Sequence, residues 1–210
     1  MFNFQNQTVI VTGGNGGIGR AIGLAFAQAE ADVVLIGRNQ AKGRESVQLL
    51  AKHNYEAAFF AVDLADQAQV AAFYSDFAQK YGTLNVLINC AGAGESRGGS
   101  VKAWAAGQTE QQIRQRWDDM AGSNLQSAYL MSTLSVAHLA PSASIINITS
   151  TASIHGNYGL YGTMKAGAEG LTRSLAVELA PQGIRVNAIS PGWIQTTNTL
   201  PNPDDPAQAA

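Results

Sequence analysis

The chain has 210 residues, 46% hydrophobic and 13% charged, so it can bury one sizeable core without a disulfide or a metal. Its formal net charge of −2 provides no basic field for nucleic acid or anionic lipid, and neither partner is expected. A single cysteine excludes an internal disulfide, and the N-terminal residues lack the basic region and apolar run of a signal peptide, which favours a cytoplasmic protein.

Short apolar runs alternate with helical patterns along the chain, and such runs are typical of buried parallel strands. The expected strands are Thr8–Val11, Asp32–Ile36, Ala57–Val62, Leu84–Asn89, Ser144–Ile148 and Arg185–Ser190. The expected helices are Gly17–Ala29, Gln40–Lys52, Ala65–Tyr81, Glu110–Ala121, Asn124–Leu139 and Tyr161–Ala180. This alternation predicts an α/β fold, a Rossmann-like doubly wound parallel sheet with ligands at the carboxyl ends of its strands.

A glycine-rich turn follows the first expected strand, with the sequence Thr12-Gly13-Gly14-Asn15-Gly16-Gly17-Ile18-Gly19, and leads into a helix. Glycines allow positive φ and close backbone approach, and a helix N-terminus attracts anions, so a phosphate is expected here. Two registers fit: Gly14, Gly16 and Gly19, or Gly13, Gly17 and Gly19. The alternative interpretation is a flexible loop.

The end of the second strand predicts the cofactor. A site for NAD needs an acid there to bond the ribose 2′-hydroxyl, whereas a 2′-phosphate is repelled by an acid and attracted by Arg. Gly37 takes the acid's position and Arg38 follows, so NADP(H) is preferred over NAD(H). Arg38 could instead only solvate the start of the next helix, and Arg20 or Lys42 could contribute in its place.

Tyr161 and Lys165 are four residues apart, which places both side chains on one face of a helix. A neighbouring cation favours the ionised form of a phenol and makes it a better acid/base. An ordinary amphipathic face is the competing interpretation. His53, His138 and His155 show no metal-ligand spacing, and no metal site is predicted.

Six motifs, in chain order, resemble those of a known family. They are Thr12-Gly13 with Gly17 and Gly19, Asn89-Cys90-Ala91-Gly92, Asn124, Ile145–Ser150, Tyr161 with Lys165, and Pro191–Thr196. Over most of its length the chain resembles a short-chain dehydrogenase/reductase of the single-domain Tyr-x-x-x-Lys type. It departs from the family pattern in Cys90, which replaces a second Asn, in a shortened interval from Ser150 to Tyr161, and in ending soon after Thr196.

The resemblance implies hydride transfer between a nicotinamide and a carbonyl or alcohol carbon. Tyr161 would be the acid/base and Lys165 would support it, while Ser150 would bond the substrate oxygen and Asn124 would hold a water. Tyr158 could replace Tyr161 if the shortened loop shifts the register. Thr149, Thr151 and Ser153 are the alternatives to Ser150.

The resemblance also implies a set of cofactor-binding residues. Asp63 would contact the adenine, although it could instead cap the next helix, and Ile194 and Thr196 would meet the carboxamide. The full set is Thr12, Gly13, Asn15, Gly17, Ile18, Gly19, Arg38, Asp63, Asn89, Ala91, Gly92, Tyr161, Lys165, Pro191, Gly192, Ile194 and Thr196.

Residues 1–196 are expected to form one NAD(P)-binding domain, and residues 197–210, with three prolines, an irregular tail. Family members continue into a substrate-covering helix pair and a seventh strand. We therefore expect six strands, an open edge at Arg185–Ser190 and a site open to water. The helices near Asn124–Leu139 and Tyr161–Ala180 would offer the surfaces by which relatives dimerise, which favours a homodimer or homotetramer.

The predicted function is that of an NADP(H)-dependent oxidoreductase acting on a small carbonyl or secondary alcohol substrate. The alternatives are a 3-oxoacyl-thioester reductase of the fatty-acid synthesis type and a nucleotide-binding regulator with weak turnover. A sugar-nucleotide epimerase shares Tyr-x-x-x-Lys but needs a larger C-terminal domain than the fourteen residues after Thr196.

Overall fold

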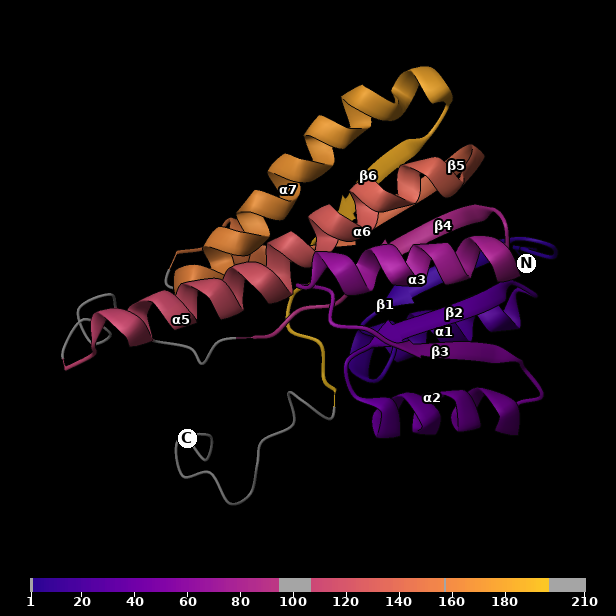
Figure 1. Ribbon diagram of the computed structural model, residues 1–210, viewed down its shortest axis with the longest axis horizontal. Helices are drawn as coiled ribbons and strands as arrows, with labels where there is room; N and C mark the ends of the chain where they lie inside the picture. Colours follow the sequence, from indigo (N-terminus) through magenta and orange to yellow (C-terminus); the bar gives the residue numbers. More distant parts are fainter. Residues whose placement is uncertain (1, 95–106, 157, 197–210) are drawn as a thin grey trace.

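The structure, a computed structural model, describes residues 2–94, 107–156 and 158–196. Six parallel strands form one sheet in the order β3-β2-β1-β4-β5-β6 (Figure 1). Because the strand order reverses between β1 and β4, ligands are expected at the carboxyl edge of the sheet there. The predicted Rossmann-like doubly wound sheet is confirmed. The strands are β1 (Thr8–Thr12), β2 (Asp32–Gly37), β3 (Ala57–Ala61), β4 (Leu84–Asn89), β5 (Leu139–Ile148) and β6 (Arg185–Ile189).

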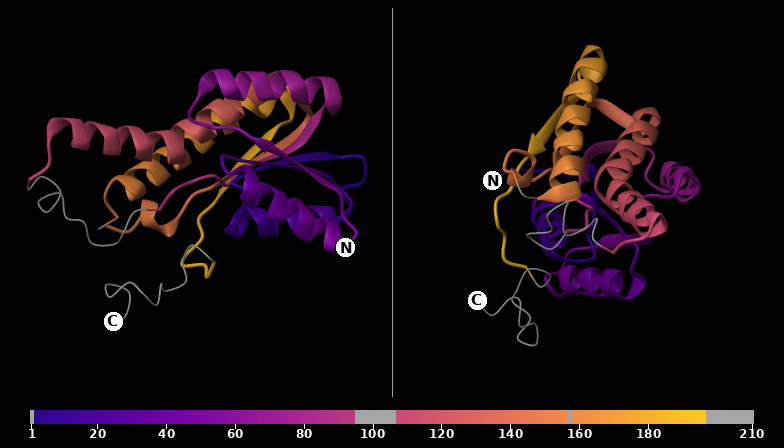
Figure 2. Two further views of the ribbon diagram at one scale, coloured as in Figure 1. Left: turned by 60° about the horizontal axis from the view of Figure 1, so that its bottom comes forward. Right: turned by 90° about the vertical axis from the view of Figure 1, so that its left-hand side faces the viewer.

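Helices cover both faces of this sheet (Figure 2). One layer contains α3 (Gln67–Lys80), α6 (Ser127–Ser135) and α7 (Gly159–Leu179), and the other contains α1 (Gly17–Gln28) and α2 (Gln40–Lys52). The first layer shares a core with Ile10 and Ile145, and the second with Val11 and Leu35. A strand that helices cover on both faces of the sheet needs apolar side chains on both of these faces. This explains why the strands appear in the sequence as continuous apolar runs.

The helix α5 (Glu110–Ala121) continues into α6, where the sequence analysis expects a break before Asn124. A π-helical turn, Gly122–Gln126, joins the two helices. Gly122 keeps helical angles of −55° and −51°, and a Cβ there would lie 3.1 Å from the Ala65 Cβ. The glycine therefore allows a close approach to the loop before α3 and does not end the helix. In Figure 1, α5 extends beyond the sheet along the line of α6.

Strand β5 is longer than predicted. It begins at Leu139 instead of Ser144, because Leu139 already lies opposite Leu84 of β4. A register shift separates this first pair from the regular pairing that starts at Ser144. The helical prediction that reached Leu139 is wrong at its end, where the chain enters the sheet.

Three helix starts also differ from the prediction. The helix α3 begins at Gln67 instead of Ala65, because the Asp66 side chain accepts two N–H groups of its first turn as the N-cap. The helix α7 begins at Gly159, so that Tyr161 lies within its first turn. The helix predicted from Asn124 corresponds to α6, which begins at Ser127 after the π-helical turn, and the remaining predicted elements agree with the structure to within one residue.

The two edge strands of the sheet are β3 and β6. Within the described residues no strand pairs with the outer side of β6, and only Val186 of this strand is buried. Among the described residues β6 is therefore an edge strand, as the sequence predicts. The predicted irregular tail, 197–210, lies outside the described residues. Nowhere in residues 2–94, 107–156 and 158–196 is a helix long and apolar enough to cross a membrane.

Candidate active site

The turn after β1 is built from glycine backbone. Gly13 and Gly17 have positive φ angles of 69° and 51°, a conformation that favours glycine. A Cβ on Gly19 would lie 2.5 Å from the carbonyl oxygen of Gly13, whereas one on Gly16 would meet no atom of the described residues within 4 Å. These contacts favour the register of Gly13, Gly17 and Gly19. The α1 N-terminus follows Gly16, and no side-chain hydrogen bond caps it. A phosphate at its backbone N–H groups stays a prediction.

Asn15 and Gly37 meet at the carboxyl ends of β1 and β2. A Cβ on Gly37 would lie 2.7 Å from both Cγ and Oδ1 of Asn15. The Asn15 side chain therefore occupies the space in which an acidic side chain at position 37 would begin. Arg38, the next residue, is exposed beside this position.

Asp63 closes a local turn after β3. Its Oδ1 accepts the N–H of Ala65 at 3.1 Å, and its own N–H donates to Oε1 of Gln69 at 2.9 Å. The N-cap of α3 is Asp66, so Asp63 does not cap that helix. A contact from Asp63 to an adenine ring stays a prediction.

Thr12 joins the ends of β1 and β4. Its Oγ1 accepts the N–H groups of Cys90 and Ala91, both at 2.9 Å. Burial raises the pKa of the Cys90 thiol to about 11, and nearby Lys165 opposes this shift. The thiol is therefore neutral at physiological pH and acts as a small apolar group.

Asn89 is buried in a polar network behind the site. Its Nδ2 donates to Ser132 Oγ at 2.9 Å and to Asn147 Oδ1 at 2.8 Å. Asn147 Nδ2 in turn donates to Thr172 Oγ1 on α7 at 2.8 Å. The network links β4, β5, α6 and α7, so the Asn89 side chain has a structural role, and its contact with a cofactor stays a prediction.

Lys165 is buried next to Tyr161. It is 5% exposed, its Nζ donates to the carbonyl of Ile148 at 3.0 Å, and Nζ lies 5.7 Å from the centroid of the Tyr161 ring. Loss of hydration lowers the pKa of Lys165, and Coulombic interaction with Cys90 opposes the shift. The four-residue spacing thus brings the two side chains together. Tyr158, the alternative acid/base, is the N-cap residue of α7.

Asn124 lies in the π-helical turn, a feature frequent at functional sites. Its Nδ2 donates to the carbonyls of Ala93 at 3.1 Å and Met120 at 3.2 Å. Its Oδ1 is buried without a hydrogen-bond partner among the described residues. A Cβ on Gly92 would lie 2.8 Å from this oxygen and 3.2 Å from Lys165 Nζ. Both polar atoms therefore face the space beside Gly92, which glycine keeps open and which suits a bridging water.

Ser150 caps the short turn Thr151–Ser153, where its Oγ accepts the N–H of Ala152 at 3.2 Å. Since the hydroxyl accepts in this bond, its hydrogen can be donated to another group. A Cβ on Gly162 would lie 2.7 Å from the Ala152 carbonyl oxygen. Glycine after Tyr161 therefore lets the first turn of α7 pack against the turn that carries Ser150.

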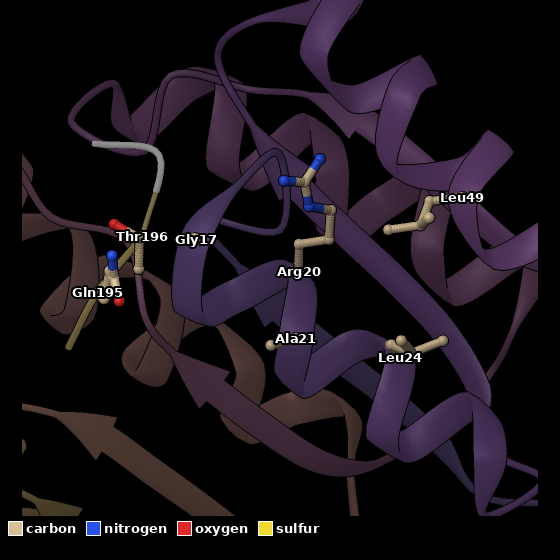
Figure 3. A pocket seen from close by; sticks show the side chains of 7 residues that line it. All are labelled: Gly17, Arg20, Ala21, Leu24, Leu49, Gln195 and Thr196. Carbon is tan, nitrogen blue, oxygen red and sulfur yellow. The ribbon is translucent and has the colours of Figure 1, made fainter. Parts of the chain in front are cut away.

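The segment after β6 runs from the Ser150 turn to the glycine turn. The N–H of Thr151 donates to the Pro191 carbonyl at 3.0 Å, and Thr196 Cγ2 would lie 3.6 Å from a Cβ on Gly17. A pocket of about 270 Å³ borders this segment (Figure 3). Gly17 and Thr196 belong to the predicted cofactor-binding set, and none of the lining residues is a predicted catalytic residue. The pocket therefore borders the predicted cofactor site. The lining residues are Gly17, Arg20, Ala21, Leu24, Leu49, Gln195 and Thr196.

Glu169 is a residue that the sequence analysis does not single out. It follows Lys165 by four residues on α7, and its Oε1 accepts a hydrogen bond from Ser153 Oγ at 2.6 Å. The spacing in the sequence could have indicated this residue, because Tyr161, Lys165 and Glu169 follow one another at four-residue steps on one helix face.

Known proteins resemble this chain over nearly its whole length. The family model described as short chain dehydrogenase matches residues 7–206. An uncharacterized oxidoreductase of Thermotoga maritima is 31% identical over 213 residues, 97% of this chain and 80% of the relative. The 3-oxoacyl-[acyl-carrier-protein] reductase FabG of Chlamydia trachomatis is 33% identical over 199 residues, 92% of this chain and 76% of the relative.

Among solved structures, a short chain dehydrogenase from Burkholderia cenocepacia in complex with NADP has a TM-score of 0.80 and 28% identity. The match covers 93% of this chain and 77% of that one. The family model, the relatives and the fold all support the family that the sequence resembles. The chain belongs to the short-chain dehydrogenase family and is an oxidoreductase of that family.

Proposed function

We propose that the protein is an NADP(H)-dependent oxidoreductase that transfers a hydride between the nicotinamide and a carbonyl or secondary alcohol carbon. The observation that carries this proposal is the buried Lys165, whose Nζ lies by the Tyr161 ring and faces the same space as Asn124 Oδ1. A buried ammonium disfavours folding unless it is compensated, and such groups cluster at functional sites. Its single described hydrogen bond, to Ile148, leaves further donors for a ribose and a water.

Each residue of the site has a proposed task. A bound nicotinamide cofactor would supply or accept the hydride. In the direction of reduction Tyr161 donates the proton to the substrate oxygen, and the Lys165 ammonium stabilises the phenolate that remains. Ser150 donates its free hydrogen to the same oxygen and stabilises the charge that develops there. Asn124 Oδ1 accepts a hydrogen bond from a water that connects Lys165 with solvent.

The cofactor preference is proposed from the space around Asn15. With Gly37 covered by Asn15, the end of β2 presents no carboxylate to repel a 2′-phosphate, and Arg38 offers a guanidinium that can pair with one. The solved relative in complex with NADP is consistent with this preference.

Titration with NADPH and NADH tests the preference directly, because NADPH should bind at least about tenfold more tightly through its added phosphate contact. Gly37→Asp with Arg38→Ala should reverse the order once Asn15→Ala makes room for the new carboxylate. Asn15→Ala alone is the matched control for the loss of the amide. Equal dissociation constants for the two cofactors in the unmodified protein would refute the preference.

A 3-oxoacyl thioester is the first substrate class to test, because the Chlamydia trachomatis relative is named as a reductase of such substrates. We would follow NADPH oxidation with acetoacetyl-CoA, simple ketones and sugars. Turnover of the thioester well above the others would support this class. No oxidation with any carbonyl would favour the nucleotide-binding regulator instead.

The proposal includes a homo-oligomer, because both helices expected to form the interface expose apolar side chains. Tyr129 on α6 is 50% exposed and Val177 on α7 is 78% exposed. Light scattering after gel filtration should give a mass of two or four chains, and Tyr129→Glu should lower it. A monomer for the unmodified protein would contradict this part.

A further inference from the structure

The carboxylate of Glu169 joins two segments that come from different parts of the chain. Its Oε1 accepts a hydrogen bond from Ser153 Oγ at 2.6 Å and another from Ser190 Oγ at 3.1 Å. Ser153 ends the turn that Ser150 caps, and Ser190 follows β6 directly. One oxygen atom on α7 therefore connects the substrate side of the proposed site with the segment that leads to Pro191.

On the substrate side, Ser153 bonds both Glu169 and the backbone of Ser150. The Ser153 Oγ also lies 2.7 Å from the carbonyl oxygen of Ser150, and the Ser153 N–H donates to the same carbonyl at 3.0 Å. Because a hydroxyl has one hydrogen, Ser153 shares it between this carbonyl and Glu169. The backbone position of Ser150 thus depends on where Glu169 holds Ser153.

On the other side, Ser190 also contacts Thr149, which directly follows β5. The Ser190 Oγ lies 2.6 Å from Thr149 Oγ1, and the single hydrogen of Thr149 is shared between this oxygen and the carbonyl of Ile189 at 3.1 Å. The N–H of Thr151 donates to the Pro191 carbonyl at 3.0 Å. The Ser150 turn and the Pro191 segment therefore share a closed set of hydrogen bonds with Glu169 at its centre.

We propose that Glu169 is a positioning residue that fixes the Ser150 turn relative to the Pro191–Gly192 segment. The inference rests on the proposed function, in which Ser150 bonds the substrate oxygen, and on the expectation that Ile194 and Thr196 meet the carboxamide. Glu169 acts through the serines and touches neither substrate nor cofactor. Its contribution comes from hydrogen bonding, so Gln, which keeps an acceptor oxygen and adds a donor, should replace it.

Three variants test this role: Glu169→Ala, Glu169→Gln and the control Glu178→Ala, which removes an exposed carboxylate from the same helix. Hydrogen exchange followed by mass spectrometry needs no substrate. In Glu169→Ala it should show faster exchange both in 150–154 and in 189–192. Glu169→Gln should restore slow exchange in both segments, and Glu178→Ala should leave them unchanged.

With acetoacetyl-CoA and NADPH, Glu169→Ala should lower kcat by about a hundredfold, since a displacement of about 1 Å in a catalytic group has effects of this size. The NADPH dissociation constant should change little, and Glu169→Gln should recover most of kcat. Should Glu169→Ala not fold, Ser153→Ala removes the hydroxyl that contacts Glu169 and the Ser150 carbonyl and leaves the bond from Ser190 to Glu169. Exchange should then rise in 150–154 more than in 189–192.

Two exchange results would overturn the inference: unchanged exchange in both segments of Glu169→Ala, or faster exchange confined to one of them. A loss of kcat in Glu169→Gln equal to that in Glu169→Ala would also overturn it, because charge and not hydrogen bonding would then be the cause. If the unmodified protein reduces no carbonyl, the proposed function fails, while the exchange result still decides whether Glu169 couples the segments.

Discussion

The two sides of the carboxyl edge are built by opposite means. Around the β1 turn the structure depends on absent side chains: Gly19 presses against Gly13, and Gly37 against Asn15. Around α7 it depends on buried polar side chains, among them Lys165 and Asn124. Substitutions that add atoms should therefore disrupt the β1 turn, and substitutions that remove polar atoms should disrupt the region around α7.

The largest expected effect lies on the polar side. Tyr161→Phe removes one oxygen that transfers the proton, so kcat should fall by about a thousandfold, within the usual range for loss of a general acid. NADPH affinity, measured by fluorescence titration, should be nearly unchanged because little contact area is lost. Tyr158→Phe is the control. Activity that survives in Tyr161→Phe but disappears in Tyr158→Phe would assign the acid/base to Tyr158.

The glycine side is tested by adding one methyl group. In Gly19→Ala the new Cβ meets the Gly13 carbonyl, and displacing this backbone should cost about 1–3 kcal/mol. If the turn shifts while the protein stays folded, NADPH affinity should fall about tenfold to a hundredfold. Gly16→Ala adds the same methyl group where no atom of residues 2–94, 107–156 and 158–196 lies within 4 Å. Equal affinities for the two variants would show that the turn adapts.

Gly92 combines both features, because this glycine lies next to the buried polar atoms of Asn124 and Lys165. The Cβ of Gly92→Ala would press on Asn124 Oδ1 and Lys165 Nζ and fill the space proposed for a water. We expect kcat to fall about tenfold, a moderate loss for a displaced catalytic group. Gly94→Ala, whose added Cβ has no atom of the described residues within 4 Å, should behave like the unmodified protein. An unchanged kcat in Gly92→Ala would argue against the water.

The smallest expected effect concerns stability and pH. Burial lowers the pKa of Lys165 in the folded protein below its ordinary value of 10.5. At pH values between the folded-state pKa and the ordinary one, the unfolded chain therefore binds more protons than the folded protein. Stability should therefore rise with pH in that window. Lys165→Met loses this dependence, so the stability of the unmodified protein relative to this variant should increase from neutral pH to about pH 10.

Urea unfolding at both pH values measures this difference, and Lys52→Met, which replaces an exposed lysine, is the control. A relative stability that does not change with pH would mean that Lys165 is hydrated in solution.

The sequence by itself determined the sheet, the glycine turn and the pairing of Tyr161 with Lys165. Strand pattern and four-residue helical spacing are local properties that are read within a few residues. The preference for glycine at Gly13 and Gly17 is also local, since positive φ is a property of single residues. Element ends were less accurate, as at Leu139, because pairing with a distant strand sets them.

Only the tertiary structure decided which groups from different elements meet. Gly122 favours a helix end by residue type, yet packing near Ala65 continues the helix and turns Asn124 toward Lys165. Thr12 fits the nucleotide motif, but its hydroxyl accepts two N–H groups that lie more than seventy residues away. The contacts of Glu169 with Ser153 and Ser190 likewise exist only once α7, the Ser150 turn and β6 have packed together. Such contacts depend on the relative placement of whole elements, which residue type and spacing along the chain do not specify.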